Sequence, residues 1–189
     1  MQIDASLQRY QPYFCEENVL QLLKSVQLLE YERRVVFISN ANKTVAMWGQ
    51  RAGRAENPEN PVIWDYHVVL LLVKEGLILD LDNREKFIWS IREWLAHSFR
   101  NDISERFLPM FRVIPSIDFE TNFSSDRSHM LNPETGKPLQ CFPPWDAPFD
   151  PPLGMNLMKW VDMENSAIGG IVVDRNGLEQ LCFKRIEEE

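Results

Sequence analysis

The sequence predicts an α+β fold in which helices pack on an antiparallel β-sheet. Apolar, β-rich segments joined by short turns indicate antiparallel strands, and amphipathic segments beside them indicate helices. The chain has 189 residues, of which 44% are hydrophobic, so it can bury a real core. This length corresponds to about one domain, and we expect residues 1–189 to form a single domain.

The first half of the chain predicts one helix followed by strands. Residues 16–29 carry apolar side chains at helical spacing, and Glu16 and Glu17 suit the first turn because acids there oppose the positive end of the helix dipole. Cys15 then falls at the helix N-terminus. The predicted strands are residues 34–39, 44–48, 62–73 and 77–82. The third of these is apolar almost throughout, which indicates a central strand.

The second half predicts more helix. Asn83 can cap a helix that runs to about residue 99 and has one apolar face. Further predicted elements are a strand at 111–114, a short helix at 156–163, a strand-like segment at 167–173 and a closing helix at 178–186. The region 133–152 is rich in Pro and Gly, which predicts an ordered surface excursion.

Charge and cysteine content exclude several classes of function. The net charge of -8 repels phosphate backbones, so we expect no nucleic-acid partner, whereas a cationic ligand such as a free amino group is compatible. The 3 cysteines are odd in number and widely spaced, which argues against a disulfide framework. There is no Gly-rich phosphate loop or metal-spaced cluster, so no cofactor and no metal are expected.

The same features bear on location. The first residues lack the basic and apolar regions of a signal peptide, and the longest apolar run, residues 68–73, is too short to cross a membrane. We therefore expect no membrane association and a cytoplasmic protein, with the nucleus as a second location. We also expect a monomer.

Three residues carry the candidate chemistry in the order nucleophile, base and orienting acid. A thiol attacks a carbonyl as its thiolate, a nearby imidazole generates that thiolate, and the imidazole needs a partner on its other nitrogen. A Cys is most often a small buried hydrophobe. The helix N-terminus and the downstream His67 favour a nucleophile at Cys15, with a lowered thiol pKa.

The orienting acid follows in the next strand. Asp80 and Asp82 point to one face there, because side chains alternate along a strand. A four-residue loop at 73–76 would put Asp82 opposite His67 and Asp80 diagonal to it, whereas a three-residue loop would place both acids on the other face. Spacing alone therefore does not choose between the two.

The remaining histidines and cysteines have weaker settings. His97 lies off the apolar stripe of its predicted helix and is expected to be solvated. His129 lies in a polar loop, where it could line a cleft or stabilise the loop. Cys141 lies in the Pro-rich excursion and Cys182 in an amphipathic segment, and neither setting resembles that of Cys15.

Several blocks of sequence form a pattern, at residues 13–18, 36–40, 61–70, 80–82, 111–114, 122–123, 125–130 and 155–157. The most specific are Trp-Asp-Tyr-His at 64–67 and Ser-Asp-Arg-Ser-His-Met at 125–130. Together these blocks resemble the protein N-terminal glutamine amidohydrolase family.

The resemblance implies a single catalytic domain that converts the N-terminal Gln of a protein or peptide to Glu and releases ammonia. The new acidic terminus can then feed a degradation-signal pathway. The family's fold is of the papain and transglutaminase type, and its Cys-His-Asp triad falls on Cys15, His67 and Asp80. A thioester intermediate and no cofactor are implied.

A site restricted to terminal Gln must read the α-amino group, which is largely cationic at neutral pH. The candidate acids are Glu16, Glu17 and Asp65, and Asp65 is favoured because it lies two residues before His67 on the same predicted strand face. For Glu16 and Glu17 the commoner role is helix N-terminal electrostatics.

Two alternatives stay open from the residues. One is another thiol enzyme, either a peptidase or a transglutaminase-like acyltransferase, which the triad order does not separate from an amidohydrolase. The other is a non-catalytic peptide-binding module that uses Trp145 and the surrounding prolines.

Overall fold

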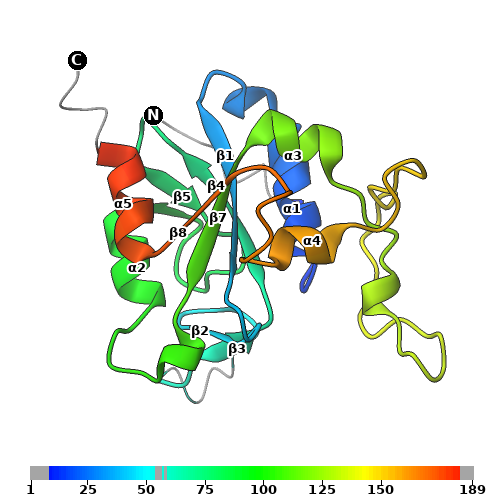
Figure 1. Cartoon of the computed structure of the whole chain (residues 1–189), viewed down its shortest axis with the longest axis horizontal. Coiled ribbons are helices and arrows are strands. Elements are labelled where there is room, and N and C mark those ends of the chain that lie inside the picture. Colours follow the sequence, from blue (N-terminus) through cyan, green and yellow to red (C-terminus); the bar gives the residue numbers. More distant parts are fainter. Residues whose placement is uncertain (1–8, 54–56, 58, 184–189) are drawn as a thin grey trace.

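A six-stranded antiparallel sheet forms the centre of the molecule (Figure 1). The computed structural model describes residues 9–53, 57 and 59–183, and all structural statements concern these. The sheet order is β6-β5-β4-β1-β7-β8, and every neighbouring pair is antiparallel. Its strands are β1 (Arg33–Ser39), β4 (His67–Leu72), β5 (Leu77–Leu79), β6 (Ile88–Ser90), β7 (Met110–Pro115) and β8 (Ile171–Val173). The predicted α+β class with an antiparallel sheet is confirmed.

Helices cover both faces of the sheet. Figure 1 shows α1 (Cys15–Leu23), α3 (Ser116–Asn122) and α4 (Leu157–Val161) on one side, and α2 (Ile91–Ser98) and α5 (Arg175–Phe183) on the other. Alternation along β1 produces this division: Val35 and Phe37 join the core under α1, whereas Val36 and Ile38 join the core under α2. Short 3₁₀ turns lie at Val26–Leu28, Glu105–Phe107 and Ser128–Met130.

The predicted strand at 62–73 is wrong as a single element. It divides into β3 (Val62–Trp64), which pairs with β2 (Val45–Met47) in a separate two-stranded sheet, and β4 in the main sheet. Between them the Asp65 carboxylate accepts the Tyr66 N–H at 3.0 Å, and the Asp65 carbonyl accepts the Ser39 hydroxyl at 2.7 Å. These local side-chain bonds replace the strand ladder and turn the chain.

The predicted helix from Asn83 to residue 99 is also too long. Residues 88–90 form β6 against β5, and α2 begins only at Ile91. Ser90 caps that helix: its hydroxyl oxygen accepts the Glu93 N–H at 3.4 Å and its hydroxyl donates to the Glu93 carboxylate at 2.9 Å. A Ser followed three residues later by Glu is a capping box, and this signal lies inside the apolar periodicity that favoured a longer helix.

Other predicted elements agree within a few residues, with four exceptions. The helix predicted at 16–29 ends at Leu23, the strand at 77–82 ends at Leu79, and α3 was not predicted. The closing helix begins at Arg175 rather than 178, and residues 184–186 of the prediction lie outside the described residues. No helix in the described part of the chain has the length and apolar character needed to cross a membrane.

Candidate active site

Cys15 is the first residue of α1, as predicted, and only 6% of its surface is exposed. The chain enters this position through Tyr13, whose φ of 69° is in the left-handed region, a strained conformation for a residue other than Gly. Phe14 then turns inward and packs edge-on against Phe142. The sulfur lies at the start of β4, because the Val68 N–H is hydrogen-bonded to it. This thiol is therefore fixed between a helix N-terminus and a central strand.

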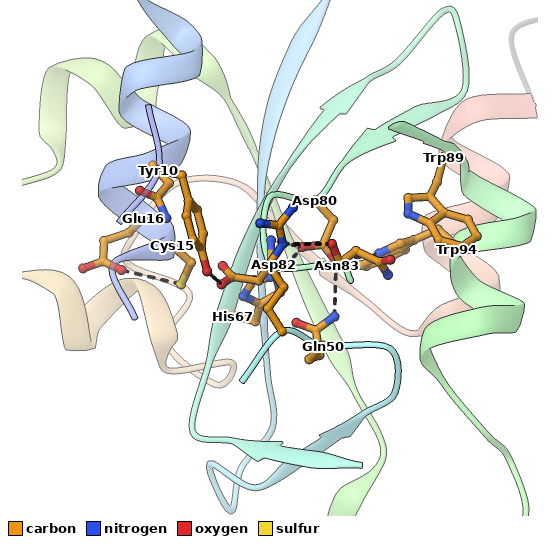
Figure 2. A network of polar contacts seen from close by, with 12 residues as sticks. Tyr10, Cys15, Glu16, Gln50, His67, Asp80, Asp82, Asn83, Trp89 and Trp94 are labelled. Carbon is orange, nitrogen blue, oxygen red and sulfur yellow. Dashed lines mark hydrogen bonds and ion pairs between the residues drawn. The ribbon is translucent and has the colours of Figure 1, made fainter. Parts of the chain in front are cut away.

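His67 is the first residue of β4 and is fully buried. Its Nε2 lies 2.9 Å from Asp80 Oδ1, and its ring stacks on Trp64 with 5.6 Å between centroids. Its other nitrogen, Nδ1, is buried without a hydrogen-bond partner in the described structure. Figure 2 shows Cys15 and Asp80 on opposite sides of His67. The ring is thus held by an acid on one nitrogen and has the other one unused.

The acid that contacts His67 is Asp80. In the pairing of β4 with β5, Leu70 faces Leu79, which is the register expected for the four-residue loop. If β5 continued in this register, Asp82 would lie opposite His67. However, β5 ends at Leu79, and the chain turns there. Asp82 instead accepts the Tyr10 hydroxyl at 2.7 Å.

Asp80 is held by a full set of donors. Besides His67, its carboxylate accepts the Asp82 N–H at 3.1 Å, the Trp94 indole N–H at 3.0 Å and the Gln50 amide at 3.4 Å (Figure 2). Burial opposes ionisation, but the charge and hydrogen bond of His67, with the other donors, outweigh it and lower the pKa of Asp80. Sequence reasoning did not identify Gln50 or Trp94.

The pKa of His67 is raised. Burial disfavours the imidazolium, but the charge of Asp80 and its hydrogen bond outweigh that effect. This ring is therefore suited to accept a proton on Nδ1 while Asp80 stabilises the resulting cation.

The predicted lowering of the Cys15 pKa is wrong for this structure. Burial raises the pKa of the thiol, the negative charges of Glu16 and Asp82 add to that effect, and the Val68 N–H opposes it only in part. The helix N-terminus does not outweigh these effects, and Glu16, one of the two acids that favour the helix start, itself lies beside the sulfur.

The three acids considered for the substrate amine have different settings. Glu17 is engaged by Arg127 in two bonds of 2.8 Å and by the Trp145 indole at 2.7 Å, so it serves to hold the Pro-rich excursion on α1. Asp65 is exposed in the break between β3 and β4, so the argument that it shares a strand face with His67 is wrong. Glu16 is fully buried beside the thiol.

Glu16 has one satisfied and one unsatisfied oxygen. Its Oε2 accepts the Tyr66 hydroxyl at 3.0 Å and lies 3.6 Å from Cys15 Sγ, whereas Oε1 has no hydrogen-bond partner in the described structure. His129 Nε2 lies 3.8 Å from that oxygen, and neither ring nitrogen of His129 has a hydrogen-bond partner among the residues that the structure describes. Sequence reasoning left the role of His129 open and did not single out Tyr66.

The other singled-out residues lie away from this site. His97 stacks on Trp89 with 4.6 Å between centroids, so it is half-buried rather than solvated. Cys141 is exposed and Cys182 is buried in α5, and all 3 cysteines are free. In the described part of the chain, no group of three or more His, Cys, Asp or Glu residues could hold a metal ion.

Comparison with known proteins identifies the family of this chain. A family model described as N-terminal glutamine amidase matches residues 10–182. The protein N-terminal glutamine amidohydrolase of Drosophila melanogaster is 37% identical over 71% of this chain and 70% of its own length. That of Drosophila mojavensis is 38% identical over the same shares. This chain belongs to the N-terminal glutamine amidase family.

Proposed function

We propose that this protein hydrolyses the side-chain amide of an N-terminal Gln, leaving Glu and releasing ammonia. The observation that carries the proposal is the buried His67 ring, which is bonded to Asp80 through Nε2 and has its Nδ1 unused on the side of the Cys15 thiol. This is the arrangement that nucleophilic thiol catalysis requires. Membership of the family supports the choice of amide and substrate.

In the first half of the proposed reaction, Cys15 Sγ attacks the Cδ carbon of Gln and the thiol proton passes to His67 Nδ1. Because the thiol pKa is raised, this transfer occurs when the substrate is in place rather than in the resting enzyme. The tetrahedral intermediate then loses ammonia, which takes the proton from His67, and a thioester to Cys15 remains. Asp80 stabilises the imidazolium during this step.

In the second half, water attacks the thioester carbon and gives a proton to His67. Collapse of this intermediate breaks the C–S bond, returns the proton to the thiol and releases the Glu terminus. The backbone N–H of Cys15 is a candidate donor to the oxyanion.

We also propose a fold type, a location and an oligomeric state for the enzyme. A nucleophile at a helix start, packed on the strand that bears the His, supports a papain or transglutaminase-like core. We place the enzyme in the cytoplasm, with the nucleus as a second location, as a monomer that needs no cofactor. Its products would feed an N-terminal degradation-signal pathway.

The test is mass spectrometry of a Gln-starting peptide after incubation with the protein. Conversion of the amide to an acid adds about one mass unit and releases ammonia. Cleavage of the peptide, or transfer of its Gln side chain to an added amine, would instead identify a thiol peptidase or an acyltransferase. An unchanged peptide in all assays would contradict the proposal.

A further inference from the structure

A buried, unpartnered acceptor lies beside the proposed nucleophile. Glu16 is fully buried, yet its Oε1 has no partner among the described residues. Leaving such an oxygen unpaired costs about 1–3 kcal/mol, more for a charged group, so native proteins seldom do so without a reason. His129 Nε2 lies 3.8 Å from this oxygen, which is too far for a good hydrogen bond but leaves both atoms available to one small donor.

The position of this oxygen suits the length of a Gln residue. Glu16 Oε2 is 3.6 Å from Cys15 Sγ, and two C–O bonds of about 1.2 Å each place Oε1 no more than about 6 Å from the sulfur. In Gln the α-nitrogen and the reacting Cδ are separated by four bonds, which span about 5 Å when extended. With Cδ about 3–3.5 Å from the sulfur, the α-nitrogen can reach Oε1.

The other acids near the thiol are less suitable. Asp82 already accepts the Tyr10 hydroxyl, and Glu17 is paired with Arg127. Asp65 is exposed, so water competes with any cation for it. Glu16 therefore combines burial, proximity to the sulfur and a free oxygen in one side chain.

We propose that Glu16, with His129 as a second acceptor, binds the α-ammonium group of the substrate's N-terminal Gln and thereby restricts the enzyme to chain termini. This inference rests on the proposed function and deepens it. An internal Gln has an amide in place of the ammonium and leaves Glu16 unsatisfied. An N-terminal Asn is one bond shorter, so its amide carbon falls short of the sulfur when its amine is bound.

His129 fits the second role because it is neutral. Burial lowers the pKa of its ring, so near neutral pH one ring nitrogen can accept a hydrogen bond. A neutral ring places no competing positive charge beside Glu16, so the substrate ammonium can supply one there. His129 lies in the short turn Ser128–Met130, which the adjoining Arg127 anchors to α1 through Glu17.

The experiment compares two peptides that differ only in the amine. One begins with Gln, and the other carries the same side-chain amide on a residue whose α-amino group is replaced by hydrogen. For the wild-type protein, kcat/KM should be about 10- to 100-fold higher on the free amine, the range of a charge-assisted hydrogen bond. Glu16→Gln should reduce this ratio to near 1 by lowering only the free-amine value.

Matched variants identify which acid binds the α-amino group of the substrate. Asp65→Asn and Asp82→Asn should keep the wild-type ratio, and His129→Leu should reduce it in part. An equal loss on both peptides in Glu16→Gln would assign Glu16 a structural role and overturn the proposal. So would a collapse of the ratio in Asp65→Asn instead.

Binding separates this inference from the proposed function. Calorimetry with Cys15→Ala protein measures affinity for the two peptides without any turnover. We expect a free-amine preference that disappears in the Cys15→Ala, Glu16→Gln double variant. If wild-type protein leaves Gln peptides unchanged, the proposed activity fails, and this binding comparison still decides the role of Glu16: equal affinities for the two peptides would contradict it.

Discussion

Replacing Glu16 with Gln should stabilise the folded protein relative to wild type. This stabilisation should be larger at pH 8 than at pH 5. Burial raises the pKa of Glu16 from its ordinary 4.5 to about 7, and the nearby charge of Glu17 contributes in the same direction. Glu16 is fully buried, so this shift is not screened by solvent. Gln has nearly the same shape, can still accept the Tyr66 hydroxyl and does not ionise.

The direction of the pH dependence follows from whether the folded or the unfolded chain loses the Glu16 proton at the lower pH. Below pH 4.5 the carboxyl is protonated in both the folded and the unfolded chain, so burial of a charge costs nothing. Between pH 4.5 and about 7 the unfolded chain ionises first, and the folded state loses stability as the pH rises. At about 1.4 kcal/mol per pKa unit, the loss is about 3 kcal/mol at most.

The assay is urea unfolding of wild type and Glu16→Gln at pH 5 and pH 8. Titrations of groups that do not interact with Glu16 occur alike in both proteins and cancel in the comparison. The stability difference between the two proteins should be larger at pH 8 than at pH 5 by up to about 2.5 kcal/mol, a shift in midpoint on the order of 1 M urea. A difference that is the same at both pH values would refute the burial argument for Glu16.

Three further changes test other parts of the site. Asp80→Asn should reduce kcat far more than Asp82→Asn. The loss should be on the order of 10⁴, as for the corresponding Asp-to-Asn change in a Ser-His-Asp triad. Similar losses in the two variants would show that the orienting acid is misassigned. Exposed Cys141 should react with iodoacetamide faster than Cys15 at pH 7 in the resting protein, because the pKa of the Cys15 thiol is raised. Peptide mapping after brief labelling measures this order, and faster labelling of Cys15 would contradict the raised pKa. Glu17→Ala should lower stability in urea by about 3 kcal/mol, because it leaves a buried guanidinium unpaired, and an unchanged midpoint would contradict that role.

Local sequence patterns were sufficient to place Cys15 at a helix start and His67 on a central strand. The acidic pair and the helical periodicity after Cys15 predicted a helix start there, and the structure has one. His67 lies on a central buried strand, as the apolar run around it indicated. Both predictions depend on short-range periodicity, which is the most reliable signal in a single sequence.

Residue spacing alone could not predict features that depend on where a strand ends, and only the family resemblance indicated Asp80 rather than Asp82. The contact of Asp80 with His67 exists because β5 stops at Leu79, and nothing in the alternating pattern marks that position. Likewise, β3 and β4 are both β-rich and apolar, so the break at Asp65 has no compositional signal. Only the three-dimensional arrangement of the strands decides these points.

The pairing of Glu16 with His129 is a long-range contact and was not predictable. The two residues come from α1 and from a turn far along the chain, and the fold alone brings them to 3.8 Å. The pKa of Cys15 was mispredicted for a related reason. The helix N-terminus is a local feature, whereas the burial and the Asp82 charge that outweigh it are tertiary.

The central claim is that Cys15 performs nucleophilic attack on an N-terminal Gln. The most direct measurement is the mass of a Gln-starting peptide after incubation with wild-type protein and with Cys15→Ala, each shown to be folded by urea unfolding. Wild type should add about one mass unit and release ammonia, and Cys15→Ala should leave the peptide unchanged. Deamidation by folded Cys15→Ala protein would contradict the account.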